Sequence, residues 1–296
     1  QFARAVLIQF ETYIYHKNKS RLSKLILFLF ISTSSYISLF AQVNINQQID
    51  STISRASLYL SDTNPDLDFG SYALIHFCNL KYGVQMPEYE KHAFSRIQKV
   101  YKGKENEWIN FKRLIDKKAK PLRWKDIKNT QSSIDSITLQ ALWSDKLKIN
   151  KTDYYKSLKN LSEQGSYELT HALLACVWLE ENNVTNTQID ADFALLKFSL
   201  IDKINHQILT NVKFWSDLEI EAVALLLYAN EKKLVKPEYI QSIIHSQKAD
   251  GGWVYSEAVD SSSLPHTTSL AIWALLQYSH QPLSADTWIQ FKKKRK

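Results

Sequence analysis

The chain has 296 residues, of which 45% are hydrophobic and 23% charged, with six glycines, six prolines and two cysteines. This composition predicts a globular protein with a large core and excludes collagen-like, disordered and disulfide-framework proteins. The formal charge of +7 lies at the chain ends, because residues 43–291 carry 27 basic against 29 acidic side chains, so no nucleic-acid partner is expected.

Residues 1–42 are interpreted as segments outside the folded domain. Residues 1–16 are expected to be a non-native or upstream extension, and residues 17–42 have the order of a signal peptide: a cationic stretch, an apolar run over 25–40 and a small residue at Ala41. The run is shorter than the roughly 20 residues that a membrane span prefers, although an uncleaved anchor is the alternative. The sequence therefore predicts a secreted or periplasmic protein.

Residues 43–296 are predicted to form one nearly all-helical domain, because glycine and proline are scarce and apolar residues recur at spacings of three and four. We expect helices over 45–61, 69–82, 88–101, 106–118, 133–148, 152–163, 167–182, 187–206, 217–232, 236–247, 267–279 and 284–293. The most polar segment, 101–132, is expected to be an insertion or a rim. Cys78 and Cys176 sit within apolar helical patterns and are predicted to be buried and unpaired, with a disulfide as the alternative.

The expected helices are of two kinds. Some, such as 167–182, are apolar on nearly all sides, whereas others, such as 236–247, carry a single apolar stripe. An all-round apolar helix must be covered on both sides, which predicts an inner and an outer layer of helices. The similar stretches "GSYALIH" (70–76) and "GSYELTH" (165–171) support repetition. We therefore predict an all-α fold, an α/α toroid of five to six hairpins, with a curved solenoid as the alternative.

The stretch "SQKADGGWVYS", followed by the apolar helix from Thr267, resembles a repeat of the terpenoid cyclase and protein prenyltransferase β-subunit superfamily. Gln247, Asp250 and the Gly-Gly-Trp turn at 251–253 carry the resemblance, which covers residues 246–278. It implies an α/α toroid.

The same resemblance suggests a metal site but weakens the case for the family's reactions. It implies that Asp217, Glu219 and His266 occupy positions comparable to zinc ligands, but Glu219 stands where the prenyltransferases have a cysteine, so the thiolate ligand is missing. Oxygen and imidazole donors still suit a divalent metal. The DxDD and DDxxD runs of the cyclases are absent. No cofactor is expected, and a divalent metal is a secondary possibility.

Three histidines, His76, His171 and His266, are spaced 95 residues apart near the starts of apolar helices. In a toroid such positions open on one end of the ring, so the imidazoles could share a pocket. The alternative is three separate histidines bonded to backbone carbonyls. The catalytic candidates are His171, Glu221 and His266, with Glu168 as another partner for His171.

The ligand-binding candidates are Asp250, Trp253, Glu257 and His266, because the connection from 248 to 266 is long for a compact helical domain. We expect a non-catalytic ligand-binding or interaction scaffold whose partner is a small molecule, a glycan or a protein. The alternative is an enzyme acting on a glycan or isoprenoid in the toroid cavity. Membrane contact is expected only through an uncleaved signal segment or the basic tail at 292–296.

Overall fold

The computed structural model describes residues 45–62, 68–84, 95, 110–128, 130, 132–182, 188–256, 262–283 and 287–289. The chain divides into two compact units, residues 1–48 and 49–296. Only residues 45–48 of the first unit are described, and the architecture below is that of the second. The predicted extension (1–16) and signal peptide (17–42) lie outside the described residues.

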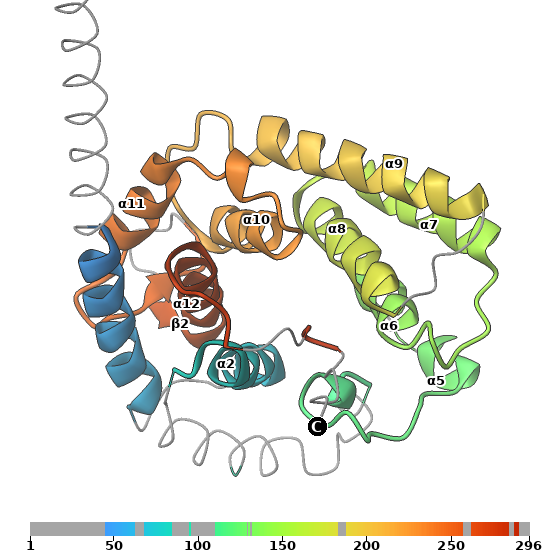
Figure 1. Ribbon diagram of the computed structural model, residues 1–296, viewed down its shortest axis with the longest axis horizontal. Coiled ribbons are helices and arrows are strands. Elements are labelled where there is room, and N and C mark those ends of the chain that lie inside the picture. The colour runs from blue at the N-terminus through green and yellow to red at the C-terminus, as the bar shows by residue number, and fades with distance from the viewer. Residues whose placement is uncertain are drawn as a thin grey trace, which may run out of the picture. The chain divides into compact units, whose positions relative to one another are not determined.

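Where it is described, the second unit is mostly helical with two short strands (Figure 1), which confirms the predicted all-α class. Its longer helices are α2 (Phe69–Tyr82), α6 (Ser133–Leu142), α7 (Lys151–Ser162), α8 (Ser166–Glu181), α9 (Gln188–Lys203), α10 (Asp217–Tyr228), α11 (Pro237–His245) and α12 (Pro265–Ser279), and residues 49–61 are also helical. The shorter elements are the single turns η1 (Lys112–Leu114), η2 (Ile204–Ile208) and η3 (Lys232–Leu234), the helix α5 (Trp124–Lys128), and the strands β1 (Trp253–Val254) and β2 (Ser263–Leu264). Among the described residues, none of the helices is long and apolar enough to cross a bilayer.

The predicted helix ends agree within two residues for α2, α7, α8, α11 and α12. Local capping explains several starts. The Asp68 side chain accepts from the Ser71 amide at 2.8 Å and so begins α2, and Ser216 and Glu219 form a reciprocal capping box at the start of α10.

Other predicted helices are shorter than expected or wrong. Helix α6 stops at Leu142, α10 stops at Tyr228, and the predicted helix over 187–206 changes into a π turn after Lys203. The predicted helix over 284–293 is wrong where the chain is described, because residues 287–289 are not helical. The predicted helix over 88–101 lies outside the described residues except for residue 95, which is helical.

A buried arginine explains why the predicted helix over 106–118 appears as only one 3-10 turn, η1, within its described part. The Arg113 guanidinium donates to the Leu142 carbonyl at 2.6 Å and to both carboxylate oxygens of Asp145 at 2.5 and 3.0 Å. It also donates to Asn182 at 3.2 Å. These tertiary bonds fix residues 110–115 against the end of α6, and they outweigh the local helical preference.

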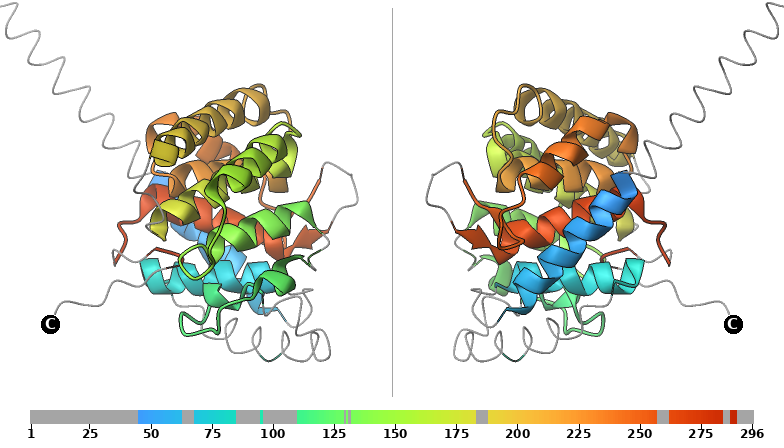
Figure 2. Two further views of the ribbon diagram at one scale, coloured as in Figure 1. Left: turned by 90° about the vertical axis from the view of Figure 1, so that its right-hand side faces the viewer. Right: turned by 90° about the vertical axis from the view of Figure 1, so that its left-hand side faces the viewer.

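Five helices pack side by side in the order α6, α8, α10, α12, α2 (Figure 1). Helix α8 shows why: every side chain from Ala172 to Leu179 is buried, so it needs neighbours on all sides. Helices α7 and α9 both pack against α8, and the two views in Figure 2 show them on one side of the unit. Helix α11 has one apolar stripe, formed by Ile240, Ile243 and Ile244.

The Gly-Gly-Trp turn lies where the helical residues 49–61 meet α11 and the two strands. Strand β1 pairs antiparallel with β2, which shortens the long loop predicted over 248–266. A Cβ atom on Gly251 would lie 2.4 Å from the Arg55 carbonyl oxygen, and one on Gly252 would lie 2.4 Å from the Ser263 Cβ. Both positions therefore require glycine because neighbouring backbone and side chains approach too closely for any side chain.

Cys78 and Cys176 are both buried free thiols, as predicted. Cys78 lies on α2 and Cys176 on α8, and each fills a small apolar position within a row of packed helices. Burial raises the pKa of the Cys176 thiol to about 12, so it stays protonated and unreactive at neutral pH.

Candidate functional site

A cavity of about 350 Å³ opens among α2, α6, α8, α10 and α12 and the segments around Phe111 and Trp288. Its aromatic lining consists of Phe69, Phe111, Trp178, Trp273 and Trp288, and its aliphatic lining of Leu74, Leu114, Leu174, Leu225 and Leu270. Its polar lining consists of Asp68, Asp135, Thr138, His171, Glu221 and His266. A volume near the lower end of the roughly 300–1,000 Å³ range of ligand pockets suits one small molecule.

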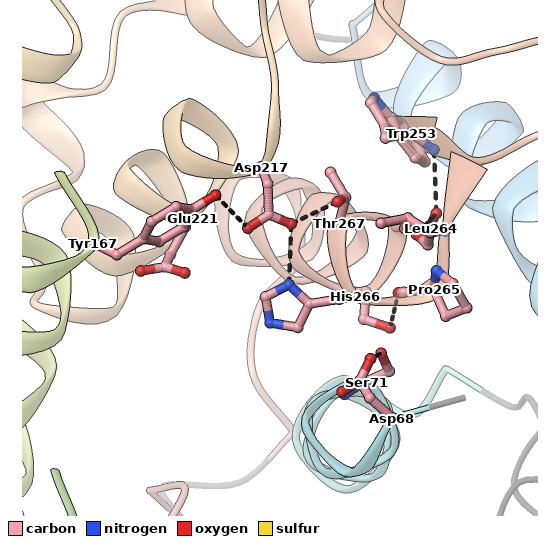
Figure 3. Close-up of polar contacts among 12 residues, drawn as sticks. Asp68, Ser71, Tyr167, Asp217, Glu221, Trp253, Leu264, Pro265, His266 and Thr267 are labelled. Carbon is pink, nitrogen blue, oxygen red and sulfur yellow. Dashed lines mark hydrogen bonds and ion pairs between the residues drawn. The ribbon is translucent and has the colours of Figure 1, made fainter. Parts of the chain in front are cut away.

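Asp217, at the first turn of α10, is the buried polar centre beside this cavity. It is 1% exposed. Its carboxylate accepts from the Thr267 hydroxyl at 2.5 Å and from the Tyr167 hydroxyl at 3.1 Å, and it lies 3.0 Å from the His266 Nδ1 (Figure 3). Burial alone would raise the pKa of Asp217, but the hydrogen bond and charge of His266 outweigh it and lower the pKa below its usual value.

His266, at the start of α12, is protonated at neutral pH. Burial disfavours its charged form, but the hydrogen bond with Asp217 and the charges of Asp217, Asp68 and Glu221 raise its pKa to about 9. Its side chain is 39% exposed, and it lies between Asp217 and the Asp68 end of α2 (Figure 3). The imidazolium is therefore held at Nδ1 by a buried carboxylate, while the ring lines the cavity.

A second imidazole–carboxylate pair lies one helical turn further along α10. Glu221 accepts a hydrogen bond from the Thr170 hydroxyl, and its carboxylate lies 3.4 Å from the His171 Nδ1. The same nitrogen lies 3.0 Å from the Tyr167 carbonyl oxygen. With Nδ1 donating to these acceptors, the neutral tautomer leaves Nε2 of His171 as a proton acceptor.

Helix α10 positions both pairs. Asp217 and Glu221 are four residues apart and so lie on one face of the helix. The neighbouring helices supply the imidazoles, α12 on one side and α8 on the other. The carboxyl group of Glu221 and the ring of His266 face the same region in Figure 3, and both residues line the cavity. This arrangement can donate a proton, accept one, or hold a charged group.

Three tryptophans form the tryptophan wall of the cavity: Trp178 on α8 and Trp273 on α12 lie about two helical turns beyond His171 and His266, and Trp288 packs on both. The Trp288 ring packs against Trp273 and Trp178 with centroids 5.3 and 5.7 Å apart, and Phe77 and Tyr228 extend the cluster. The indole N–H groups of Trp273 and Trp288 are buried and have no hydrogen-bond partner among the described residues. An unpaired buried donor costs roughly 1–3 kcal/mol.

Two further carboxylates complete the polar wall. Asp68 caps α2, and Asp135 lies in the first turn of α6. Burial raises the pKa of Asp135, an effect that the charge of His171 and a hydrogen bond from Ser132 partly offset. Neither lysine nor arginine occurs among the described residues that line the cavity.

The structure brings together the three predicted catalytic candidates, His171, Glu221 and His266, at one cavity. His76, the third histidine of the 95-residue spacing, is not among the lining residues. It stacks on Tyr72 with ring centroids 6.0 Å apart.

The predicted metal ligands are only partly adjacent. Asp217 contacts His266, whereas Glu219 accepts hydrogen bonds from the Ser216 amide and hydroxyl in the capping box. In the part of the chain that the structure describes, no group of three or more histidine, cysteine, aspartate or glutamate side chains is arranged to hold a metal ion.

The predicted ligand-binding residues of the long connection hold the fold together. Asp250 accepts from the Gly252 amide at 2.9 Å and from the Ser263 hydroxyl at 2.8 Å. Trp253 is fully buried, and its indole donates to the Ile243 carbonyl at 2.8 Å. Of this group only His266 lines the cavity, and Glu257 lies outside the described residues.

Sequence reasoning missed Asp68, Asp135, Tyr167, Thr170 and Phe111 as parts of the site. Asp68 caps α2 and also lines the cavity. A usable signal was the repeated "GSY" stretch, which places Tyr167 next to the cavity at the start of α8. Comparisons with protein-family models, curated proteins and solved structures found no match for this chain.

Proposed function

We propose that this protein binds a small, largely apolar molecule in the cavity between α2, α6, α8, α10 and α12. The observation that carries the proposal is the composition of the cavity lining, which combines tryptophans and leucines with a few polar groups near the starts of α2, α6, α8, α10 and α12. Ligand sites typically combine a mostly apolar surface with a few converging polar groups. The predicted leader at 17–42 adds export to the proposal.

We also propose that the helices close into an α/α toroid like that of the terpenoid cyclase and prenyltransferase superfamily. The packing order α6, α8, α10, α12, α2 supports this, as does the cover that α7 and α9 give to α8. A cavity at the inner ends of such helices is where that architecture would hold a ligand. An experimental structure in which α2, α6 and α10 do not surround one shared interior would contradict the toroid.

Binding is tested by titrating the full chain with the neutral fluorophore N-phenyl-1-naphthylamine. We expect saturable fluorescence enhancement, because the apolar wall excludes water from the bound probe. Leu225→Trp fills the cavity from α10 and should abolish the enhancement, and Leu174→Phe is a smaller change that should weaken it. Leu195→Trp, on the exposed face of α9, is the matched control. Equal probe binding by all four proteins would overturn the proposal.

Catalysis is a second candidate function, and the two imidazole–carboxylate pairs on α10 favour it. The His266 imidazolium can donate a proton, and His171 can accept one at Nε2. The apolar wall suits an isoprenoid better than a glycan. Incubation with isoprenoid alcohols and with oligosaccharides, followed by mass spectrometry, should show turnover that His266→Gln and His171→Gln both lose. Unchanged substrates would leave binding as the function.

A further inference from the structure

We propose that the ligand is an organic cation, an amine or quaternary ammonium group on an apolar body, whose charged end lies among Asp68, Asp135 and Glu221 while its body rests on the tryptophan wall. The inference rests on the proposed function, because it names the class of molecule that the same cavity takes. It follows from three observations: the charge of the polar wall, the bonds that each carboxylate already makes, and the tryptophans that line the cavity.

The charge of the polar wall is negative. Asp68, Asp135 and Glu221 line the cavity, and Asp217 lies directly behind His266. Against these four carboxyl groups stand two imidazoles. The carboxyl groups therefore outnumber the imidazoles by two. The described lining contains neither lysine nor arginine to balance the remainder.

The charge of Asp217 is compensated by the adjoining His266 imidazolium, whereas Asp68, Asp135 and Glu221 have an imidazole nearby but no lysine or arginine partner among the described residues. The Asp217 carboxylate accepts hydrogen bonds from the Thr267 and Tyr167 hydroxyls and forms an ion pair with the His266 imidazolium. The net charge of Asp217 and His266 together is therefore close to zero. Asp68 is bonded by the amide and hydroxyl of Ser71, which are neutral donors.

The other two lining carboxylates also lack a lysine or arginine partner among the described residues. Glu221 is bonded by the Thr170 hydroxyl, with the His171 Nδ1 at 3.4 Å. Asp135 has no ion pair with a lysine or arginine among the described residues. Carboxylates at a largely apolar cavity favour a cation that replaces the solvation lost when a ligand enters.

The tryptophans suit the same ligand. Trp178, Trp273 and Trp288 line the cavity although each is at most 6% exposed, and a cation near an aromatic face is attracted by the ring quadrupole. A phosphate, sulfate or carboxylate head group would instead meet a wall of like charge with a single imidazolium to balance it, so anionic amphiphiles are expected to bind poorly.

The test compares three ligands that share a decyl chain: decyltrimethylammonium, decanol and decyl sulfate, each below its micellar concentration. Each displaces N-phenyl-1-naphthylamine from the full chain at low salt. We expect decyltrimethylammonium to bind roughly tenfold or more tightly than decanol, and decyl sulfate more weakly than either. The preference for the cation should shrink as salt is added.

Charge-neutralising variants locate the effect. Glu221→Gln and Asp68→Asn should each bring the affinity for decyltrimethylammonium closer to that for decanol, and asparagine preserves the cap on α2. Asp192→Asn, exposed on α9, removes one charge from the molecule at a distance from the cavity and should leave the ratio unchanged.

Two contrary results are distinguishable. If decanol binds as tightly as the cation, or if Asp192→Asn changes the ratio as much as Glu221→Gln, the cation inference fails and the apolar-ligand function stands. If the fluorescent probe does not bind and none of the three decyl ligands has any effect, the proposed function fails as well.

Discussion

At the scale of single residues, Asp217 on α10 connects α8 and α12. Its carboxylate accepts hydrogen bonds from the Tyr167 hydroxyl on α8 and the Thr267 hydroxyl on α12, and it contacts the His266 ring on α12. The raised pKa of His266 makes this arrangement sensitive to pH. Stability from a group whose pKa rises on folding is fully present below its unfolded pKa, near 6.5, and is lost as pH rises through the folded value of about 9.

We therefore expect the free energy of unfolding to fall between about pH 6.5 and pH 9–10. Because His266 is partly exposed, solvent screening should hold the change to the order of 1 kcal/mol. The groups facing the imidazole are Asp217 and Glu221 on α10 and Asp68 at α2. Urea unfolding of the native protein and of His266→Gln at several pH values measures the difference. Parallel pH profiles for the two proteins would contradict the assignment.

At the scale of elements, substitutions in the Gly-Gly-Trp turn test how tightly the hairpin formed by β1 and β2 is packed. Gly252→Ala places a Cβ 2.4 Å from the Ser263 Cβ, so the strands must separate or α12 must shift. We expect a loss of about 1–3 kcal/mol in the free energy of unfolding.

A double variant isolates the cause of that loss. Ser263→Gly removes the atom that the new methyl group meets, so the combination with Gly252→Ala should recover part of the stability in a double-mutant cycle. Strictly additive losses would show that another neighbour, the Thr268 hydroxyl 3.1 Å from the new Cβ, and not the contact with β2, sets the requirement for glycine.

The elements also show what the sequence could predict. Helix α2, which begins at the Asp68 cap, and helix α8, a long apolar run that follows Gly165, were predicted nearly to the residue, because the information that starts them lies within a few positions. The segments 110–115 and 287–289 were mispredicted as helices. The first segment is held by the bonds of Arg113 to Leu142, Asp145 and Asn182, and the second by the bond of Trp288 to Tyr228, and all these partners lie far away in the sequence. No local pattern contains that information.

The same distinction applies to the site. His171, Glu221 and His266 could be proposed because each is a polar residue near the start of an apolar helix. That they share one cavity depends on the packing of α8, α10 and α12, which a single sequence does not encode locally. Asp250 and Trp253 belong to the Gly-Gly-Trp motif, the clearest motif in the sequence, but that motif stabilises the turn and does not line the cavity.

At the scale of the whole molecule, the cavity depends on Trp288, a residue outside every helix. Its amide donates to the Tyr228 hydroxyl at 3.2 Å, and its carbonyl accepts a hydrogen bond from Lys117. Trp288→Ala should cost about 3–5 kcal/mol and weaken binding of N-phenyl-1-naphthylamine, because one wall is removed. Thermal unfolding and probe titration measure the two effects.

Trp215→Ala is the matched control, since Trp215 packs on Tyr239 and does not line the cavity. It should lower stability while leaving probe affinity unchanged. If the two tryptophan variants weaken binding equally, the loss reflects general loosening of the fold, and Trp288 is not a wall of the binding site.

The position of Trp288 also has a consequence for biosynthesis. Residues 287–289 are translated after every other described residue that lines the cavity. The proposed pocket therefore lacks its Trp288 side until this part of the chain has been synthesised, and a ligand bound earlier would meet an incomplete lining.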